Sequence, residues 1–445
     1  MRFRSLLTAV TAASAVAGPV AVAHAAVVPG KVIVRYQDGA THSQRVLVQQ
    51  STGTSTDSVL PGGTRELKIR DGATVGQTLD KLRRHRSVAY AVPDYIAHAA
   101  DFIPNDPGKT SFAGGWQEIQ WNFTGPAGVN APGAWDLARQ AHAPGGGSGV
   151  IVAVLDSGVA YENYKGFRRA PDLYATRFVR GYDWVDRDTH PDDEESHGTH
   201  VTGTIAQKTN NGFGVTGLAY GVKIMPLRVL DRDGNGNGSD IAKAIRWATK
   251  HGAQVINMSV EFQTTETARD IPDVISAINY AEKKGVVLVA ASGNEGIGKV
   301  AYPARANGVI SVGATTATGC LADYSNAGRG LDLVAPGGGQ DAPLDDNAYD
   351  KATCDPTAPD KRIFQETLWG DVRHFRLVGF EGTSFAAPHV TAIAALIIGT
   401  KRLGPKPTPT AVRRRIMDTA RDIGPPGYDA RYGAGLADAT AALAP

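Results

Sequence analysis

Three residues that lie far apart in the sequence have the types needed for hydrolysis by an activated hydroxyl. Asp156 ends the apolar run 150–155, His197 opens an apolar segment, and Ser384 precedes the long apolar run 385–399. Acyl transfer to a hydroxyl requires a base that takes its proton and a carboxylate that orients the base. Taken singly, the three have simpler interpretations: a buried capping Asp, a core or surface His, and a Ser that caps a helix. Together they predict a catalytic triad, provided that the fold brings them together.

The segments around these residues predict alternating strands and helices. Short strands that are apolar throughout are typical of a parallel sheet covered on both faces, and functional residues of such sheets collect at the carboxyl ends of the strands. We therefore expect an α/β fold, with a mainly parallel central sheet and helices on both faces. The expected strands are 150–155, 222–230, 255–258, 286–291, 309–312 and 331–335, and the expected helices are 239–251, 271–284, 385–399 and 409–420.

The run 385–399 is too short to span a membrane and too apolar for a surface helix, so it predicts a buried core helix. Ser384 would lie at its positive end, where developing negative charge is favoured. Pro388 is expected in the first turn, where a missing N–H costs nothing.

The N-terminus predicts export. Residues 1–4 start with basic character, residues 6–22 are apolar and small, and Ala23-His24-Ala25 fits a cleavage site, so we expect a signal peptide at residues 1–25. A membrane anchor is disfavoured because small residues are many and no stop-transfer flank follows. Strand signals at 31–36 and 87–92 and a helix signal at 78–86 predict a small α+β domain at residues 26–100, followed by a larger domain at 101–445. The mature protein is expected outside the cell, without stable membrane association.

The composition limits the classes of partner that we expect. The formal net charge of +2 argues against a nucleic-acid partner, and an apolar fraction of 42% supports a substantial core. A secreted chain would pair the two cysteines, Cys320 and Cys354, across one loop; the alternative is two independent thiols.

Three motifs carry a family resemblance. Residues 152–158, with the sequence VAVLDSG, 197–203, with HGTHVTG, and 382–389, with GTSFAAPH, resemble the aspartate, histidine and serine motifs of subtilisin-like serine proteases, the subtilases. The resemblance implies a secreted endopeptidase with Asp156, His197 and Ser384 as its triad. Residues 289–296 resemble the segment whose Asn, here Asn294, faces the oxyanion.

The resemblance extends to the first domain. Residues 31–100 resemble the subtilase propeptide, which acts as an intramolecular chaperone and inhibitor, and imply self-cleavage near Ala100. The expected partners are protein or peptide substrates and the chain's own propeptide, and the expected state is a monomer.

The resemblance also implies two substrate-binding segments that would pair their backbones with an extended peptide. Glu261 stands where a glycine is usual, and Gly238 where a bulkier residue often lies. Specificity stays open, because small residues near the pocket base favour a large apolar side chain whereas Glu261 and Glu295 favour a basic one. The implied substrate-binding residues are Asn235, Gly236, Asn237, Ser259, Val260, Glu261 and Ala301.

Calcium is the expected cofactor. Seven acidic side chains lie between Asp183 and Glu195, a repulsive group unless it is solvated or bound to a hard cation. A loop at 231–235 superficially resembles an EF-hand but lacks its closing Glu. Similar acidic loops bind calcium in some thermostable subtilases, with Asp183, Asp186, Asp188 and Asp192 as the matching residues here. A second family site is implied at Asp172 and Asn211, with carbonyl groups of Thr209, Phe213 and Val215.

Two other functions are weighed against the protease. If the chain were a non-catalytic peptide-binding protein with the same fold, we would expect a triad residue to be replaced. All three triad residues are present. A metal-dependent hydrolase that uses Asp156, His197 and His200 lacks a further ligand at convincing spacing and leaves Ser384 and Asn294 without a role.

Overall fold

The computed structural model describes residues 27–95 and 102–445. The chain separates into two compact units that divide after residue 100. The predicted signal peptide at 1–25 and the predicted cleavage near Ala100 lie outside the described residues. No helix of the described part is both long and apolar enough to cross a bilayer.

The smaller unit is a four-stranded antiparallel sheet with two helices. Val32, Val34, Leu67 and Leu82 are fully buried in its core. The sequence predicted β1, α2 and β4 but not α1, β2 or β3, whose residues are too polar to show a period; α1 buries only Val48 and Thr52. In chain order the elements are β1 (Val27–Tyr36), α1 (His42–Thr52), β2 (Thr54–Val59), β3 (Arg65–Ile69), α2 (Val75–Arg83) and β4 (Val88–Tyr95), and the sheet order is β2-β3-β1-β4.

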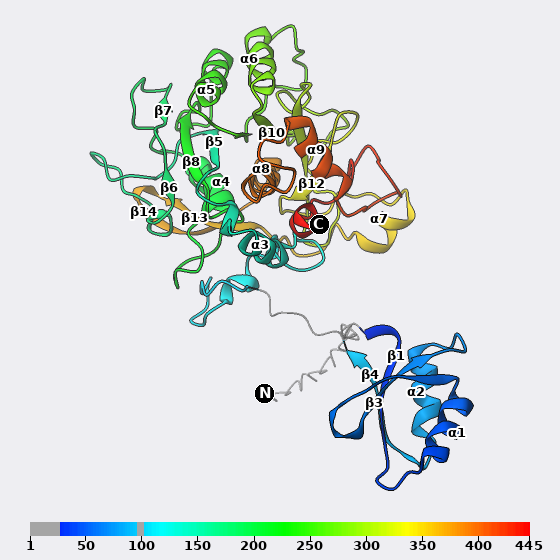
Figure 1. Cartoon of the computed structure of the whole chain (residues 1–445). Helices are drawn as coiled ribbons and strands as arrows, with labels where there is room; N and C mark the ends of the chain where they lie inside the picture. Colours follow the sequence, from blue (N-terminus) through cyan, green and yellow to red (C-terminus); the bar gives the residue numbers. More distant parts are fainter. Residues whose placement is uncertain (1–26, 96–101) are drawn as a thin grey trace, which may run out of the picture. The chain divides into compact units, whose positions relative to one another are not determined.

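The larger unit is built on an eight-stranded sheet, ordered β12-β11-β10-β9-β5-β8-β6 with β7 also paired to β8 (Figure 1). Neighbouring strands of this sheet pair in parallel throughout the described residues. The predicted α/β fold with a mainly parallel sheet is therefore confirmed. The strands are β5 (Ile151–Asp156), β6 (Arg177–Phe178), β7 (Tyr182–Asp183), β8 (Lys223–Arg228), β9 (Val255–Met258), β10 (Val287–Ala291), β11 (Val309–Thr315) and β12 (Leu333–Pro336).

Helices cover both faces of this sheet because successive side chains of each strand point to opposite faces. In β5, Val152 and Val154 join the core that contains α8, whereas Ala153 and Leu155 join the core that contains α5 and α6. The helices are α3 (Ala131–Gln140), α4 (His197–Ala206), α5 (Gly238–Lys250), α6 (Pro272–Lys283), α7 (Ala348–Thr353), α8 (Thr383–Gly399), α9 (Pro409–Asp418) and α10 (Ala439–Leu443).

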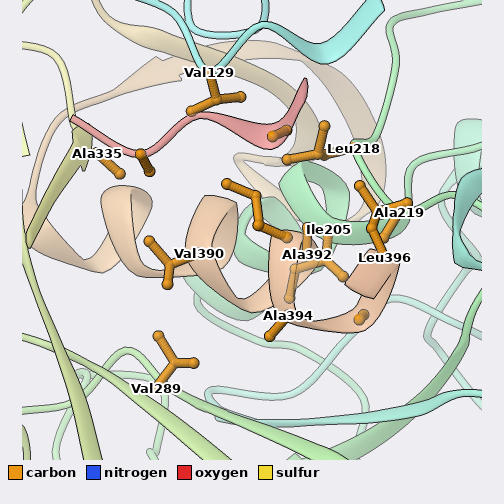
Figure 2. Packing of buried hydrophobic residues seen from close by; sticks show 14 of the residues in the cluster. Val129, Ile205, Leu218, Ala219, Val289, Ala335, Val390, Ala392, Ala394 and Leu396 are labelled. Atoms are coloured by element: carbon orange, nitrogen blue, oxygen red, sulfur yellow. The ribbon is translucent and has the colours of Figure 1, made fainter. Parts of the chain in front are cut away.

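The central helix α8 is the buried helix that the sequence predicted. Figure 2 shows Val390, Ala392 and Leu396 of α8 among residues of the sheet and of neighbouring segments, including Val289 and Leu218. The helix begins at Thr383, so Pro388 is its sixth residue rather than a first-turn residue as expected. Its missing N–H leaves the carbonyl of Ser384 without the usual intrahelical partner four residues later.

A hairpin of β13 (Ile363–Trp369) and β14 (Asp371–Phe380) precedes α8 and was not predicted. All residues of β14 except Val378 are exposed or half-exposed, which hides the strand period. The structure joins Cys320 and Cys354 in a disulfide, which decides between the two alternatives left open by the sequence.

Candidate active site

Asp156 and His197 meet where β5 ends and α4 begins. The Nδ1 atom of His197 lies 2.7 Å from Oδ1 of Asp156, which is fully buried and also accepts a hydrogen bond from the N–H of Ser157. A Cβ on Gly198 would lie 2.1 Å from the carbonyl oxygen of Gly158, so only glycine lets the two segments approach this closely. The glycine after the histidine therefore allows the pair to form.

Burial opposes a charge on His197, but the charge and hydrogen bond of Asp156 outweigh it and raise the pKa of His197 to about 9. Glu195 adds to this effect. The Nδ1 atom is occupied by Asp156, so Nε2 is the ring nitrogen left to exchange a proton in the pocket.

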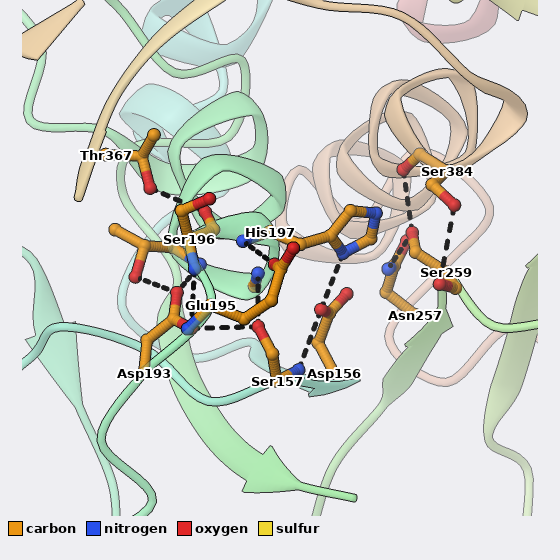
Figure 3. A network of polar contacts seen from close by, with 12 residues as sticks. Asp156, Ser157, Asp193, Glu195, Ser196, His197, Asn257, Ser259, Thr367 and Ser384 are labelled. Carbon is orange, nitrogen blue, oxygen red and sulfur yellow. Dashed lines mark hydrogen bonds and ion pairs between the residues drawn. The ribbon is translucent and has the colours of Figure 1, made fainter. Parts of the chain in front are cut away.

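Asp193 organises the loop before His197, and sequence reasoning did not assign it this role. Its two buried oxygens accept hydrogen bonds from the Ser157 hydroxyl, the N–H groups of Glu195 and Ser196, and both the N–H and the hydroxyl of Thr199. Figure 3 shows how this single side chain links the end of β5 to the start of α4. An Asp shortly before a helix was the available signal, but its link to Ser157 depends on the tertiary fold.

Ser384 lies in the first turn of α8 and faces the same pocket as His197 (Figure 3). Its hydroxyl donates to the carbonyl of Ser259 at 3.4 Å, and no hydrogen bond to His197 is present among the described residues. The Ser259 hydroxyl in turn donates to the Ser384 carbonyl at 2.7 Å, the group that Pro388 leaves free. Ser259 thus fixes the backbone of the nucleophile candidate.

Asn294 is oriented by Thr383, the residue before Ser384. The Oδ1 atom of Asn294 accepts hydrogen bonds from the Thr383 N–H at 2.8 Å and from its hydroxyl at 3.0 Å. Because a backbone N–H can only donate, the oxygen of the amide must face Thr383, and Nδ2 is directed away from it. The N–H of Ser384 lies in the first helical turn, where N–H groups lack intrahelical partners. Asn294 Nδ2 and the N–H of Ser384 are therefore the candidate donors beside the serine.

A cavity of about 490 Å³ is lined by both His197 and Ser384. Five of the seven substrate-binding candidates also line it: Asn235, Gly236, Ser259, Val260 and Glu261. Two candidates lie elsewhere. Asn237 stands at the N-cap of α5, and the fully buried Ala301 donates its N–H to the carbonyl of Ser292 without lining the cavity.

The acidic loop divides into two groups. Asp183 and Asp186 bind the buried Arg228 at 2.9 and 2.7 Å, an ion pair that the sequence did not predict. Asp188 accepts the N–H of His190. Asp192, which is 1% exposed, has no hydrogen-bond partner at either carboxylate oxygen within residues 27–95 and 102–445.

Asp192 approaches two residues that were not among the predicted ligands. Atoms of Asp192, Glu162 and His190 lie within 4.8 Å of one another, and His190 Nδ1 is 2.7 Å from Glu162 Oε1. Burial, then the charges of Glu162 and Asp188, raise the pKa of Asp192 to about 8. An orphaned, buried carboxylate beside other acids fits a hard cation such as Ca²⁺.

The second predicted calcium site has a different arrangement. The oxygens of Asp172 accept hydrogen bonds from Asn211 Nδ2, Gln207 Nε2 and the N–H of Val215, all between 2.8 and 2.9 Å. Asn211 Oδ1 accepts the N–H of Phe213. Asp172 and Asn211 therefore lie together as predicted, but protein donors already occupy their oxygens.

Comparison with known proteins gives a consistent assignment. The model of the subtilase family matches residues 147–435, and that of the fervidolysin N-terminal prodomain matches residues 13–94. The thermophilic serine proteinase of Bacillus sp. (strain AK1) is 33% identical over 411 residues, which cover 92% of this chain and 86% of the relative. Subtilisin Savinase of Lederbergia lenta is 33% identical over 326 residues, which cover 73% of this chain and 99% of the relative.

Solved structures agree with this result. A protease from Pseudoalteromonas arctica PAMC 21717 has a TM-score of 0.61 and 32% sequence identity to this chain, and the match covers 77% of this chain and 99% of that one. The family match covers more than half of the sequence and includes all three motifs around Asp156, His197 and Ser384. The chain belongs to the subtilase family and is a serine protease with an N-terminal prodomain.

Proposed function

We propose that the protein is a secreted endopeptidase in which Ser384 is the nucleophile, His197 the general base and then the general acid, and Asp156 the group that orients His197. Ser384 Oγ attacks the scissile carbonyl carbon while His197 Nε2 takes the hydroxyl proton. The tetrahedral intermediate collapses when His197 returns this proton to the departing amine, which leaves an acyl-enzyme. Water, activated by the same imidazole, then releases the acid product and restores the serine.

The contact between Asp156 and His197 carries this proposal. A buried carboxylate at 2.7 Å fixes one imidazole tautomer and stabilises the imidazolium that forms during attack. Asn294 Nδ2 and the N–H of Ser384 are the proposed donors to the oxyanion, where charge develops in the transition state. Thr383 supports this role because it holds the amide oxygen of Asn294 on the opposite side.

Both alternative functions are less well supported. A peptide-binding protein has no need for a buried carboxylate behind a pocket imidazole. The metal-hydrolase hypothesis needs His200 beside His197, but His200 is fully buried and its Nε2 donates to the carbonyls of Ile363 and Val378. His200 therefore anchors the hairpin β13–β14 to α4 instead of facing the pocket.

The remaining assignments follow from the family. We propose residues 1–25 as a signal peptide, residues 26–100 as a propeptide that assists folding and inhibits the enzyme, and residues 101–445 as the catalytic domain. The prodomain match at 13–94 supports the second assignment. Export is supported by the basic and apolar N-terminal segment.

We also propose a structural Ca²⁺ at the acidic loop, held by Asp192 with Asp188 and Glu162. Carboxylate oxygens are the ligands that calcium prefers, and both oxygens of Asp192 lack a partner in the described part of the chain. Bound calcium would neutralise the group of acids just before His197 and hold that loop in place.

Labelling with a fluorophosphonate tests the proposed nucleophile. The purified mature enzyme should lose activity in proportion to labelling, with the probe attached to Ser384. A catalytically silent control is Ser111→Ala, since Ser111 is exposed and remote in sequence from the motifs. Labelling at another residue, or full activity after stoichiometric labelling of Ser384, would refute the assignment.

A further inference from the structure

The cavity beside the nucleophile is strongly acidic. Ser384 and His197 line it together with Glu195, Glu261 and Glu266, and its described lining residues include no Lys or Arg. A substrate side chain that enters this cavity therefore meets several negative charges and no positive partner other than a protonated His197.

Glu261 occupies a fixed position in the wall of this cavity. It follows Ser259 by two residues, and the carbonyl of Ser259 accepts the Ser384 hydroxyl. The Oε2 atom of Glu261 accepts the backbone N–H of Asn294 at 3.1 Å. The carboxylate is thus attached to both segments that frame the serine: the strand end at 259–261 and the proposed oxyanion segment.

Glu295 brings a second carboxylate close to Glu261, although Glu295 does not itself line the cavity and its Oε2 accepts a hydrogen bond from Asn326 Nδ2. A Cβ built on Gly293 would lie 2.8 Å from Glu261 Oε2 and 2.9 Å from Glu295 Oε2, so the two oxygens converge on one point. Burial and the like charge of Glu295 raise the pKa of Glu261, and the other described residue that acts on its charge is Asn294, through hydrogen bonds. The pair is therefore mutually repulsive and lacks a compensating cation.

We propose that Glu261, assisted by Glu295, makes the enzyme cleave preferentially after Lys or Arg, with the basic side chain of the residue before the scissile bond paired to these carboxylates. This specificity rests on the proposed function, because it assumes that Ser384 is the nucleophile beside which the substrate binds. The usual glycine at the position of Glu261 has no side chain to supply such a charge.

The energetics favour a basic side chain over an apolar one. An aliphatic group would remove water from two carboxylates and give no hydrogen bond in return, which is unfavourable. A guanidinium or ammonium group replaces the lost water with charge-assisted hydrogen bonds and relieves the repulsion between the two acids. Such paired-charge contacts discriminate between substrates by about 10–100-fold in kcat/KM.

Matched fluorogenic peptides test this proposal. They differ only in the residue before the scissile bond, which is Arg, Lys, Gln, Leu or Glu, and are given to the mature wild-type enzyme at low salt. We expect kcat/KM for Arg and Lys to exceed that for Gln and Leu by at least about 10-fold, with Glu the poorest. The advantage should shrink in high salt, because ions screen the attraction.

Two variants locate the effect. Glu261→Gln should lower the Arg-to-Leu ratio of kcat/KM by about 10-fold, and the added Glu295→Gln should lower it further. Glu118→Gln, which removes an exposed charge outside the cavity, should leave the ratio unchanged. The proposal would be overturned if the wild-type enzyme preferred the Leu peptide. It would also be overturned if the Arg-to-Leu ratio of kcat/KM were unchanged in both Glu261 variants. The comparison of the five peptides with the wild-type enzyme tests the preference even if a variant does not mature.

This result is separable from the proposed catalytic roles. If a fluorophosphonate labels Ser384 but Leu peptides are preferred, only the specificity is wrong. If Ser384 is not labelled, the catalytic assignment itself is wrong. Self-cleavage near Ala100 does not report this preference, because a tethered segment acts at a high effective concentration.

Discussion

His197 Nδ1 lies 2.7 Å from Asp156 Oδ1, although the two residues are 41 positions apart in the chain. Asp156 is fully buried, whereas about a fifth of the His197 side chain is exposed, at 21%. A buried anion thus stands behind an imidazole that reaches the substrate cavity. This arrangement leaves Nε2 to act on Ser384.

Replacing the carboxylate tests its role in orienting the imidazole. Asp156→Asn keeps the size of the side chain but removes its charge and favours the wrong tautomer of His197. We expect kcat to fall by about 10⁴-fold with little change in KM. Peptide kinetics measure this effect, and thermal unfolding checks that the variant is folded. A folded variant with kcat within tenfold of the wild type would contradict the role of Asp156.

The raised pKa of His197 predicts an alkaline activity profile. The base must be neutral to accept the serine proton, so kcat/KM should rise with pH, reach half of its maximum near pH 9 and level off only above that. Because the folded pKa exceeds the unfolded value of about 6.5, protonation of His197 stabilises the fold below that pH. This contribution is lost as pH rises through about 9. A profile already flat from pH 6 upward would show that Asp156 does not raise the pKa of His197.

Removing the oxyanion donor should affect the transition state more than substrate binding. Asn294→Ala deletes the proposed Nδ2 donor, and we expect kcat to fall by about 10²–10³-fold while KM changes little. A burst experiment with an ester substrate would show slower acylation. An effect confined to KM would instead assign Asn294 to substrate binding.

Calcium should stabilise the mature enzyme through Asp192. Because a ligand that binds the folded state stabilises it by mass action, we expect millimolar Ca²⁺ to raise Tm by about 5 °C or more over a chelator. Asp192→Asn should lose most of this response. Asp273→Asn, which removes an exposed carboxylate at the start of α6, should keep it. An equal response in all three proteins would place the calcium elsewhere.

The sequence predicted the larger fold well because its strands are apolar on both faces. Residues 255–258 are both the predicted strand and β9, and β5, β8 and β10 begin and end within two residues of the prediction. The hairpin β13–β14 and the helix α1 were missed because neither has a clear apolar period. Amphipathic and half-exposed elements depend on contacts that a single sequence does not reveal.

The candidate site, like the fold, could be predicted from the sequence only in part. The motifs indicated Asp156 and His197, which the structure brings into contact, and Ser384, which lines the same cavity. The supporting contacts could not be predicted in this way, since Asp193 acts through a residue 36 positions away and Arg228 reaches the acidic loop from another strand. The carbonyl that Pro388 frees for Ser259 also became evident only once the start of α8 was known.

The most direct test of the account is whether Ser384 and His197 act as one unit. Ser384→Ala, His197→Ala and the double variant are prepared with the prodomain supplied separately, so that maturation does not depend on activity. If the two side chains share one proton transfer, each single variant should lose nearly all catalysis above the residual level, and the double variant should be no worse than either. If the two losses instead multiply, the residues act independently and the proposed triad is wrong.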